Sequence, residues 1–134
     1  MNSGRILALR AGSVAAAVFG VLTIRSGGAV LFGPPEASQA VGQVVPFVLW
    51  FNFLAGFAYL AAAAGLWRTA HWSVWTSAAL AAASAIVFVL LGIAIASGSA
   101  YEMRTVWAMT LRTGFWVTIA ALAWYTLRRN RQAG

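Results

Sequence analysis

Residues 73–96 read SVWTSAALAAASAIVFVLLGIAIA, a mainly apolar run without a charged side chain. A helix that crosses the hydrocarbon core of a bilayer needs about 20 such residues. Three further mainly apolar runs reach this length, at 6–32, 46–67 and 105–127. We therefore predict an all-α polytopic membrane protein that folds as an antiparallel bundle of four transmembrane helices.

The composition leaves room for one membrane domain and little else. Hydrophobic residues make up 62% of the 134 residues, charged residues make up 8%, and the mean hydropathy is +0.82. The four runs take up nearly the whole length, so we expect a single domain over residues 1–134 without a separate catalytic module. The chain contains no cysteine, which excludes disulfides, cysteine redox chemistry and thiolate metal sites.

The net charge of +7 comes from nine arginines and two acidic residues, and the arginines gather near the ends of the predicted helices. In these positions they signal membrane orientation and do not indicate a nucleic-acid partner. One side of the bundle would carry Arg5, Arg10, Arg68, Arg128, Arg129 and Arg131. The other side would carry Arg25, Arg104, the deeper Arg112, and both acids, Glu36 and Glu102. Since cytoplasmic loops are enriched in basic residues, we predict a multi-pass membrane protein with both termini in the cytoplasm.

The first run has an alternative interpretation as a signal peptide. Arg5 and Arg10 would form its basic start, and Gly27-Gly28-Ala29 would supply a small-residue cleavage site. Its apolar core from Ala11 to Ile24 is at the long end for a signal, and cleavage would weaken the arginine asymmetry. We therefore favour a retained first helix.

Small residues recur four positions apart along the second and third runs. The pairs are Ala58 and Ala62, Ala61 and Gly65, Ala78 and Ala82, Ala81 and Ala85, and Gly92 and Ala96. Small residues let helix backbones approach closely in lipid, so these stripes predict packing within the bundle or at a dimer face. The expected surroundings are the lipid bilayer, and a homo-oligomer or a membrane-complex partner both stay open.

Arg112 is the most informative polar residue, because charge inside a transmembrane run is costly. It lies five residues beyond Trp107, which places it roughly 7 to 8 Å below the outer interface. It would either snorkel along the helix surface to the headgroups or face the bundle interior and pair there. In the second case Glu36 or Glu102 would have to fold inward to meet it.

An inward-facing Arg112 predicts a polar cluster that faces the outer side. Its members would be Arg25, Glu36, Asn52, Glu102, Arg104, Thr105 and Arg112, with an aromatic wall of Trp50, Trp107 and Trp116. Three arginines and two glutamates give this cluster a formal charge of +1. One surplus guanidinium suits a carboxylate, a lipid phosphate or a quinone headgroup. Structural pairing that joins the first loop to the last helix is an equal alternative.

Catalytic and metal sites find little support in the sequence. His71 is the one histidine, and Met103 and Met109 belong to the opposite side of the predicted bundle, so a haem would lack two axial ligands at one depth. Small multidrug antiporters of similar size need a carboxylate inside the first helix, and this run has none. No Ser/His/Asp set or metal-ligand cluster is present. We expect no catalytic residue, no metal and no cofactor.

Four features of the first half of the chain form a recognisable pattern: Arg25-Ser26-Gly27, Leu31-Phe32-Gly33-Pro34, Gly56, and Gly65-Leu66-Trp67-Arg68. This pattern resembles the DoxX-like group of small four-helix bacterial membrane proteins. Arg25 stands where that group often has a lysine. Members of the group are mostly uncharacterised, and some are similar to subunits of a thiosulfate:quinone oxidoreductase. The resemblance therefore implies the fold and a location in a bacterial-type inner membrane, and says little about an activity.

Two functions follow as hypotheses. The first is a non-enzymatic membrane protein, either an accessory subunit or a binder of a lipid or small molecule at the outer-facing polar cluster. The alternative is a membrane anchor or quinone-binding subunit of an oxidoreductase complex, in which a partner would supply the redox centre.

Overall fold

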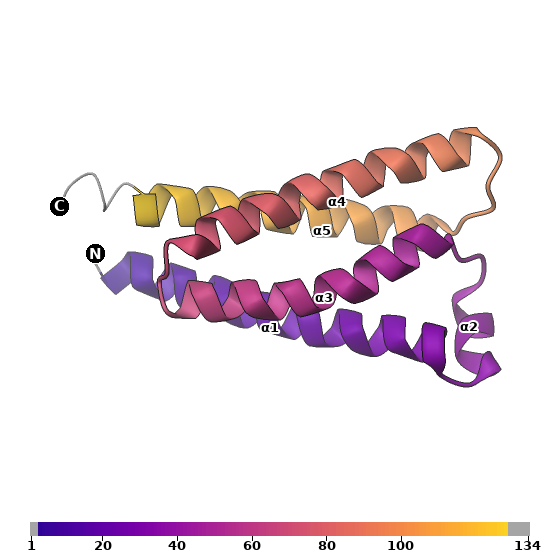
Figure 1. The fold of residues 1–134 in the computed structure, drawn as a ribbon, viewed down its shortest axis with the longest axis horizontal. Coiled ribbons are helices and arrows are strands. Elements are labelled where there is room, and N and C mark those ends of the chain that lie inside the picture. Colours follow the sequence, from indigo (N-terminus) through magenta and orange to yellow (C-terminus); the bar gives the residue numbers. More distant parts are fainter. Residues whose placement is uncertain (1–2, 129–134) are drawn as a thin grey trace.

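The computed structural model describes residues 3–128, which form helices joined by short connections (Figure 1). The long helices are α1 (Ser3–Phe32), α3 (Pro46–Trp67), α4 (Trp72–Ala96) and α5 (Met103–Ala123). A short helix, α2 (Pro35–Val41), follows α1, and a π-helical turn (Trp124–Arg128) extends α5. Counting this turn with α5, the four predicted runs agree with the observed helices to within three residues at every end.

The four long helices are each long and apolar enough to cross a membrane. In the most apolar window of each helix, only 22% to 33% of the residues are buried inside the protein. An exposed apolar surface of this extent needs lipid around it, because soluble proteins rarely expose large contiguous apolar patches. The chain is therefore a multi-pass membrane protein that folds as an antiparallel four-helix bundle, as the sequence predicts.

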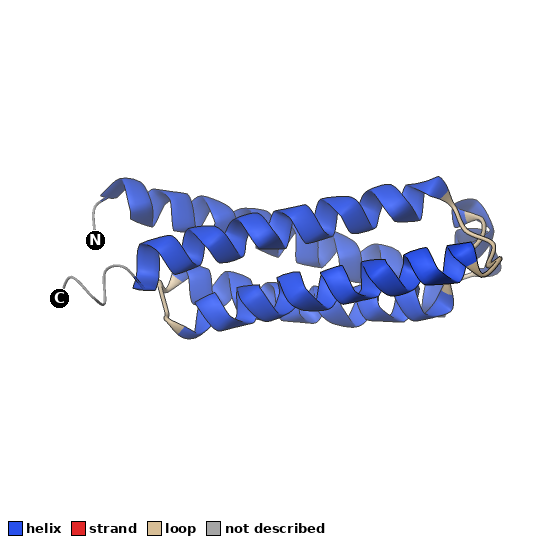
Figure 2. Ribbon diagram, turned by 90° about the horizontal axis from the view of Figure 1, so that it is seen from above, coloured by secondary structure: helices blue, strands red, loops and turns tan. Residues whose placement is uncertain are grey.

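The helices run side by side with their connections gathered at two ends (Figures 1 and 2). In Figure 1, α1 lies beside α3 and α4 lies beside α5. The start of α1, the end of α5 and the α3–α4 connection share one end, which we call the termini end. The opposite end holds α2 and the α4–α5 connection, and we call it the α2 end. The two ends therefore contain different sets of connections.

Small residues bring α1 and α3 into close contact. The buried residues of α1 are spaced alternately by four and three positions: Leu9, Ser13, Ala16, Gly20, Thr23 and Gly27. A Cβ atom at Gly20 would lie 3.0 Å from the carbonyl oxygen of Gly56, and one at Gly56 would lie 2.7 Å from Cγ1 of Ile24. The Ser13 hydroxyl donates a hydrogen bond to the Ala63 carbonyl at 2.6 Å. We call this contact the α1–α3 seam; its glycines permit the backbone approach that drives helix association in lipid.

Proline and glycine place the connection that leads from α2 to α3. Pro35 and Pro46 stand in the first turns of α2 and α3, where a fixed φ and a missing N–H are tolerated. Gly42 follows the last residue of α2 with a φ of 77°, a backbone conformation that residues with a Cβ atom rarely adopt. A Cβ atom on Gly42 would also overlap the Glu102 carboxylate. This glycine therefore lets the connection approach the residue that precedes α5.

Arginines at the termini end stack on aromatic rings. The guanidinium carbon of Arg10 lies 4.8 Å from the centre of the Trp67 ring, and that of Arg128 lies 4.2 Å from the centre of the Trp124 ring. Cation–π contacts at exposed sites contribute about 0.5–1 kcal/mol each. Amphipathic rings and cations of this kind are typical of the level of the lipid headgroups.

Candidate functional site

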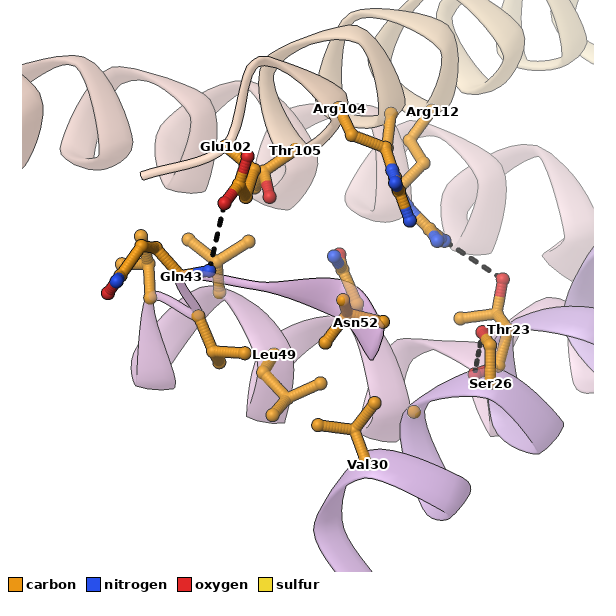
Figure 3. A pocket seen from close by; sticks show the side chains of 16 residues that line it. Thr23, Ser26, Val30, Gln43, Leu49, Asn52, Glu102, Arg104, Thr105 and Arg112 are labelled. Atoms are coloured by element: carbon orange, nitrogen blue, oxygen red, sulfur yellow. Dashed lines mark hydrogen bonds between the residues drawn. The ribbon is translucent and has the colours of Figure 1, made fainter. Parts of the chain in front are cut away.

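A cavity of about 300 Å³ lies at the α2 end between α1, α3 and α5 (Figure 3). Its volume is at the lower limit of the roughly 300–1,000 Å³ that is typical of small-molecule sites. Apolar side chains such as Val30 and Leu49 form part of the wall. The polar residues that line it are Thr23, Ser26, Gln43, Asn52, Glu102, Arg104, Thr105 and Arg112. We call this space the polar cavity.

Arg112 faces the interior of the bundle, and its partners are neutral. Its Nη1 atom donates a hydrogen bond to Oγ1 of Thr23 at 2.9 Å and a longer one, 3.4 Å, to the hydroxyl of Tyr59. The guanidinium carbon lies 5.0 Å from the centre of the Phe19 ring. Its Nε atom is buried without a hydrogen-bond partner among the described residues. The side chain therefore does not snorkel to the outer interface.

Within residues 3–128, neither glutamate pairs with Arg112. Glu102 lines the same cavity, but its Oε1 atom accepts a hydrogen bond from the backbone N–H of Gln43 at 3.1 Å. Ten helical residues separate Glu102 from Arg112, a rise of about 15 Å, which is too far for a direct pair. Glu36 lies exposed in the first turn of α2 and does not line the cavity. The expected carboxylate partner is thus replaced by two hydroxyl groups and an aromatic face.

The aromatic core below the cavity positions the hydroxyl of Tyr59. Tyr59 and Trp116 are both 0% exposed, and their ring centres lie 4.9 Å apart. Phe19 packs edge-on against Tyr59 with 5.5 Å between ring centres. Because the Tyr59 ring is fixed in this packing, its hydroxyl is held toward Arg112.

Five of the seven residues that the sequence suggests for the polar cluster line the cavity: Asn52, Glu102, Arg104, Thr105 and Arg112. Arg25 and Glu36 are exposed and do not line it. Thr23 faces the cavity, and Arg25 follows it by two residues, a rotation of about 200° around α1. Arg25 therefore points away from the cavity that Thr23 lines.

The expected aromatic wall does not form around this cavity. Trp116 is fully buried in the bundle core, whereas Trp50 and Trp107 are 45% and 69% exposed. The face of α5 toward the cavity contains Thr105 and Arg112, so Trp107 lies on another side of the helix. None of the three tryptophans lines the polar cavity.

Sequence reasoning missed the groups that hold Arg112. Thr23 is part of the small-residue stripe of α1, and the spacing of four and three positions between Gly20, Thr23 and Gly27 could have placed it on the interior face. Tyr59 has a weaker signal, because a tyrosine inside an apolar run is as compatible with core packing as with a site. Phe19 has no distinguishing signal in the sequence.

The polar cavity has the chemistry of an anion-binding site. Arg104 and Arg112 against Glu102 give its lining a formal charge of +1. The Oδ1 atom of Asn52 is buried without a partner among the described residues; as an acceptor it calls for a hydrogen-bond donor and does not itself bind an anion. No group of three His, Cys, Asp or Glu side chains that could hold a metal ion comes together within residues 3–128. The arrangement can therefore bind and orient an anion through Arg112.

No family model, no curated protein and no solved structure matches this chain. The resemblance to the DoxX-like proteins stays a prediction from the sequence.

Proposed function

We propose that the protein is a non-enzymatic membrane protein that binds a lipid or small molecule with a monoanionic group at the polar cavity. One observation carries this proposal: the half-buried guanidinium of Arg112 borders the cavity, and its hydrogen-bond partners within residues 3–128 are the neutral side chains of Thr23 and Tyr59. Buried charges are normally paired with an opposite charge, because desolvation costs several kcal/mol. An anion in the cavity would supply the missing charge and a charge-assisted hydrogen bond.

The surplus charge also favours an anion over a quinone. Quinone carbonyls accept hydrogen bonds but are neutral, so they would leave the charge of Arg112 uncompensated. The membrane anchor of a quinone-linked oxidoreductase stays the alternative from the sequence. A carboxylate and its uncharged amide therefore form an informative pair of probes.

Thermal unfolding in an uncharged detergent tests this proposal with hexanoate and hexanamide. Hexanoate should raise the unfolding midpoint, because a ligand at ten times its Kd stabilises the folded state by about 1.4 kcal/mol. Hexanamide should have a much smaller effect. Arg112→Gln should abolish the hexanoate effect, and Arg25→Gln should keep it, since Arg25 is exposed at the same end and does not line the cavity. Equal shifts by the two probes, or an unchanged shift in Arg112→Gln, would overturn the proposal.

We further infer that the polar cavity faces the outer side of a bacterial-type inner membrane, with both termini in the cytoplasm. The support is the distribution of arginine: Arg5, Arg10, Arg68 and Arg128 lie toward the termini end, and Arg25, Arg104 and the deeper Arg112 lie toward the α2 end. Arg129 and Arg131, which the sequence assigns to the same side as Arg128, lie outside the described residues.

Reporter fusions test this orientation. Fusions after Arg68 and after Arg131 should report a cytoplasmic location, and fusions near Gln39 and Ser99 should report an external one. The reverse pattern would place the polar cavity toward the cytoplasm and leave the anion-binding proposal to be judged by the hexanoate experiment alone.

A further inference from the structure

A groove runs along the lipid-exposed surface between α1 and α5. Its volume is about 540 Å³, and it is lined by residues between 15 and 26 of α1 and by Leu111 and Arg112 of α5. It extends about 16 Å along α1 at 1.5 Å per residue. Its apolar walls include Val18, Leu22 and Leu111, which are 54%, 59% and 63% exposed. We call it the lateral groove.

The lateral groove meets the polar cavity at Arg112. Thr23, Ser26 and Arg112 line both spaces. The hydrogen bond from Arg112 to Thr23 joins α5 to α1 at this boundary, and Phe19 lines the groove directly below the guanidinium. A single charged side chain thus stands between a polar space and an apolar one.

We propose that the two spaces form one site for a free fatty acid, with the carboxylate in the polar cavity on Arg112 and the alkyl chain in the lateral groove. This inference rests on the proposed anion-binding function and names its ligand class. The fatty acid would enter sideways from the bilayer, because the groove walls are exposed to lipid along their length.

The charge and shape of the site favour one chain and one negative charge. The surplus charge of +1 in the cavity matches a monoanion, and the Glu102 carboxylate, which lines the same cavity, disfavours a second negative charge such as that of a phosphate monoester. The groove follows a single pair of helices, α1 and α5, so it offers one path for an alkyl chain. The chain is already in hydrocarbon before it enters the groove, so its gain comes from packing against the groove walls and not from leaving water.

Photo-crosslinking in nanodiscs of phosphatidylcholine tests this site. The probe is a palmitic acid that carries a diazirine in the middle of its chain, and labelled peptides are mapped by mass spectrometry. We expect labelling of α1 within residues 15–26 and of α5 around Leu111. Unlabelled palmitate should compete with the probe, and methyl palmitate, which lacks the charge, should compete poorly.

Three variants separate the headgroup from the chain. Arg112→Gln should lower the competed labelling about tenfold, equivalent to about 1.4 kcal/mol, and Arg112→Lys should keep more of it. Ala15→Phe places a ring in the groove and should also reduce the labelling. Ala64→Phe is its matched control, because Ala64 is exposed on α3 and lines neither space.

The outcomes distinguish this inference from the proposed function. In one outcome, palmitate competes with the probe and the labelling depends on Arg112, but the labelled peptides lie outside the groove or the labelling is unchanged in Ala15→Phe. This outcome would overturn the fatty-acid site and leave the anion site standing. Labelling spread over the lipid-facing helices without competition would overturn the fatty-acid site as well, and the hexanoate experiment would then decide the anion site separately.

Discussion

Helix α1 meets its two neighbours, α3 and α5, in different ways. Toward α3 it presents Gly20 to the backbone of Gly56, and a Cβ atom on Gly20 would lie 3.0 Å from the Gly56 carbonyl oxygen. Toward α5 it borders the lateral groove, and the hydrogen bond from Arg112 to Thr23 crosses between them. The first contact leaves no space, and the second leaves room for a ligand.

This difference separates what holds the bundle together from what the bundle is able to bind. Close packing of small residues is the main source of helix association in lipid, and the α1–α3 seam supplies it. The contact with α5 instead uses a charged side chain, which contributes little to stability when it lacks a counter-charge. Changes in the seam should therefore affect folding, and changes at Arg112 should affect binding.

The largest effect is expected from Gly56→Leu. Its Cβ atom would lie 2.7 Å from Cγ1 of Ile24 and 3.2 Å from the Gly20 carbonyl oxygen, so the two helices would have to separate. We expect a loss of about 3 kcal/mol in the free energy of unfolding in detergent, at the upper end for overpacking. Gly92→Leu is the control, because a Cβ atom on Gly92 meets nothing within 4 Å. Equal losses in the two variants would contradict a special role for the seam.

A smaller loss, about 2 kcal/mol, is expected from Gly42→Ala. This residue combines a φ of 77° with a Cβ position that overlaps the Glu102 carboxylate. A sparsely populated positive-φ conformation alone costs a residue with a Cβ atom roughly 1–3 kcal/mol. Gly98→Ala isolates that cost, because Gly98 has a φ of 99° and open space around it. If the chemical unfolding curves of the two variants coincide, the Glu102 contact does not help to hold the start of α5.

The smallest effect on stability is expected from Arg112→Met. The change removes two hydrogen bonds, but it also removes a charge without an opposite partner, and replacing buried charges by apolar residues is often neutral or stabilising. We expect the free energy of unfolding without ligand to change by less than about 1 kcal/mol. Tyr59→Phe serves as a control that removes one hydroxyl and keeps the charge. A loss near that of Gly56→Leu would mean that Arg112 is a structural residue.

The sequence predicts the helices better than the site because the two depend on different information. An apolar run such as 73–96 specifies a membrane helix by its length alone, and Pro46 marks a helix start locally. The partners of Arg112 come from α1 and α3, so they depend on which faces of three helices meet. Thr23 could have been placed by its spacing from Gly20, and Arg25 would then follow on the opposite side of α1. The core position of Trp116 becomes visible only when the helices are assembled.

The placement of Arg112 on α5 has a consequence for how the protein is made. α5 is synthesised after the other three long helices and is the least apolar of the four. An arginine at the centre of a helix opposes insertion through the translocon by about 2.5–3.5 kcal/mol, and Arg112, which lies nearer the start of α5, opposes it by less. Thr23 and Tyr59, which receive this arginine, belong to helices that are already synthesised when α5 emerges. We therefore expect α5 to insert more readily when the earlier helices are present to receive its arginine.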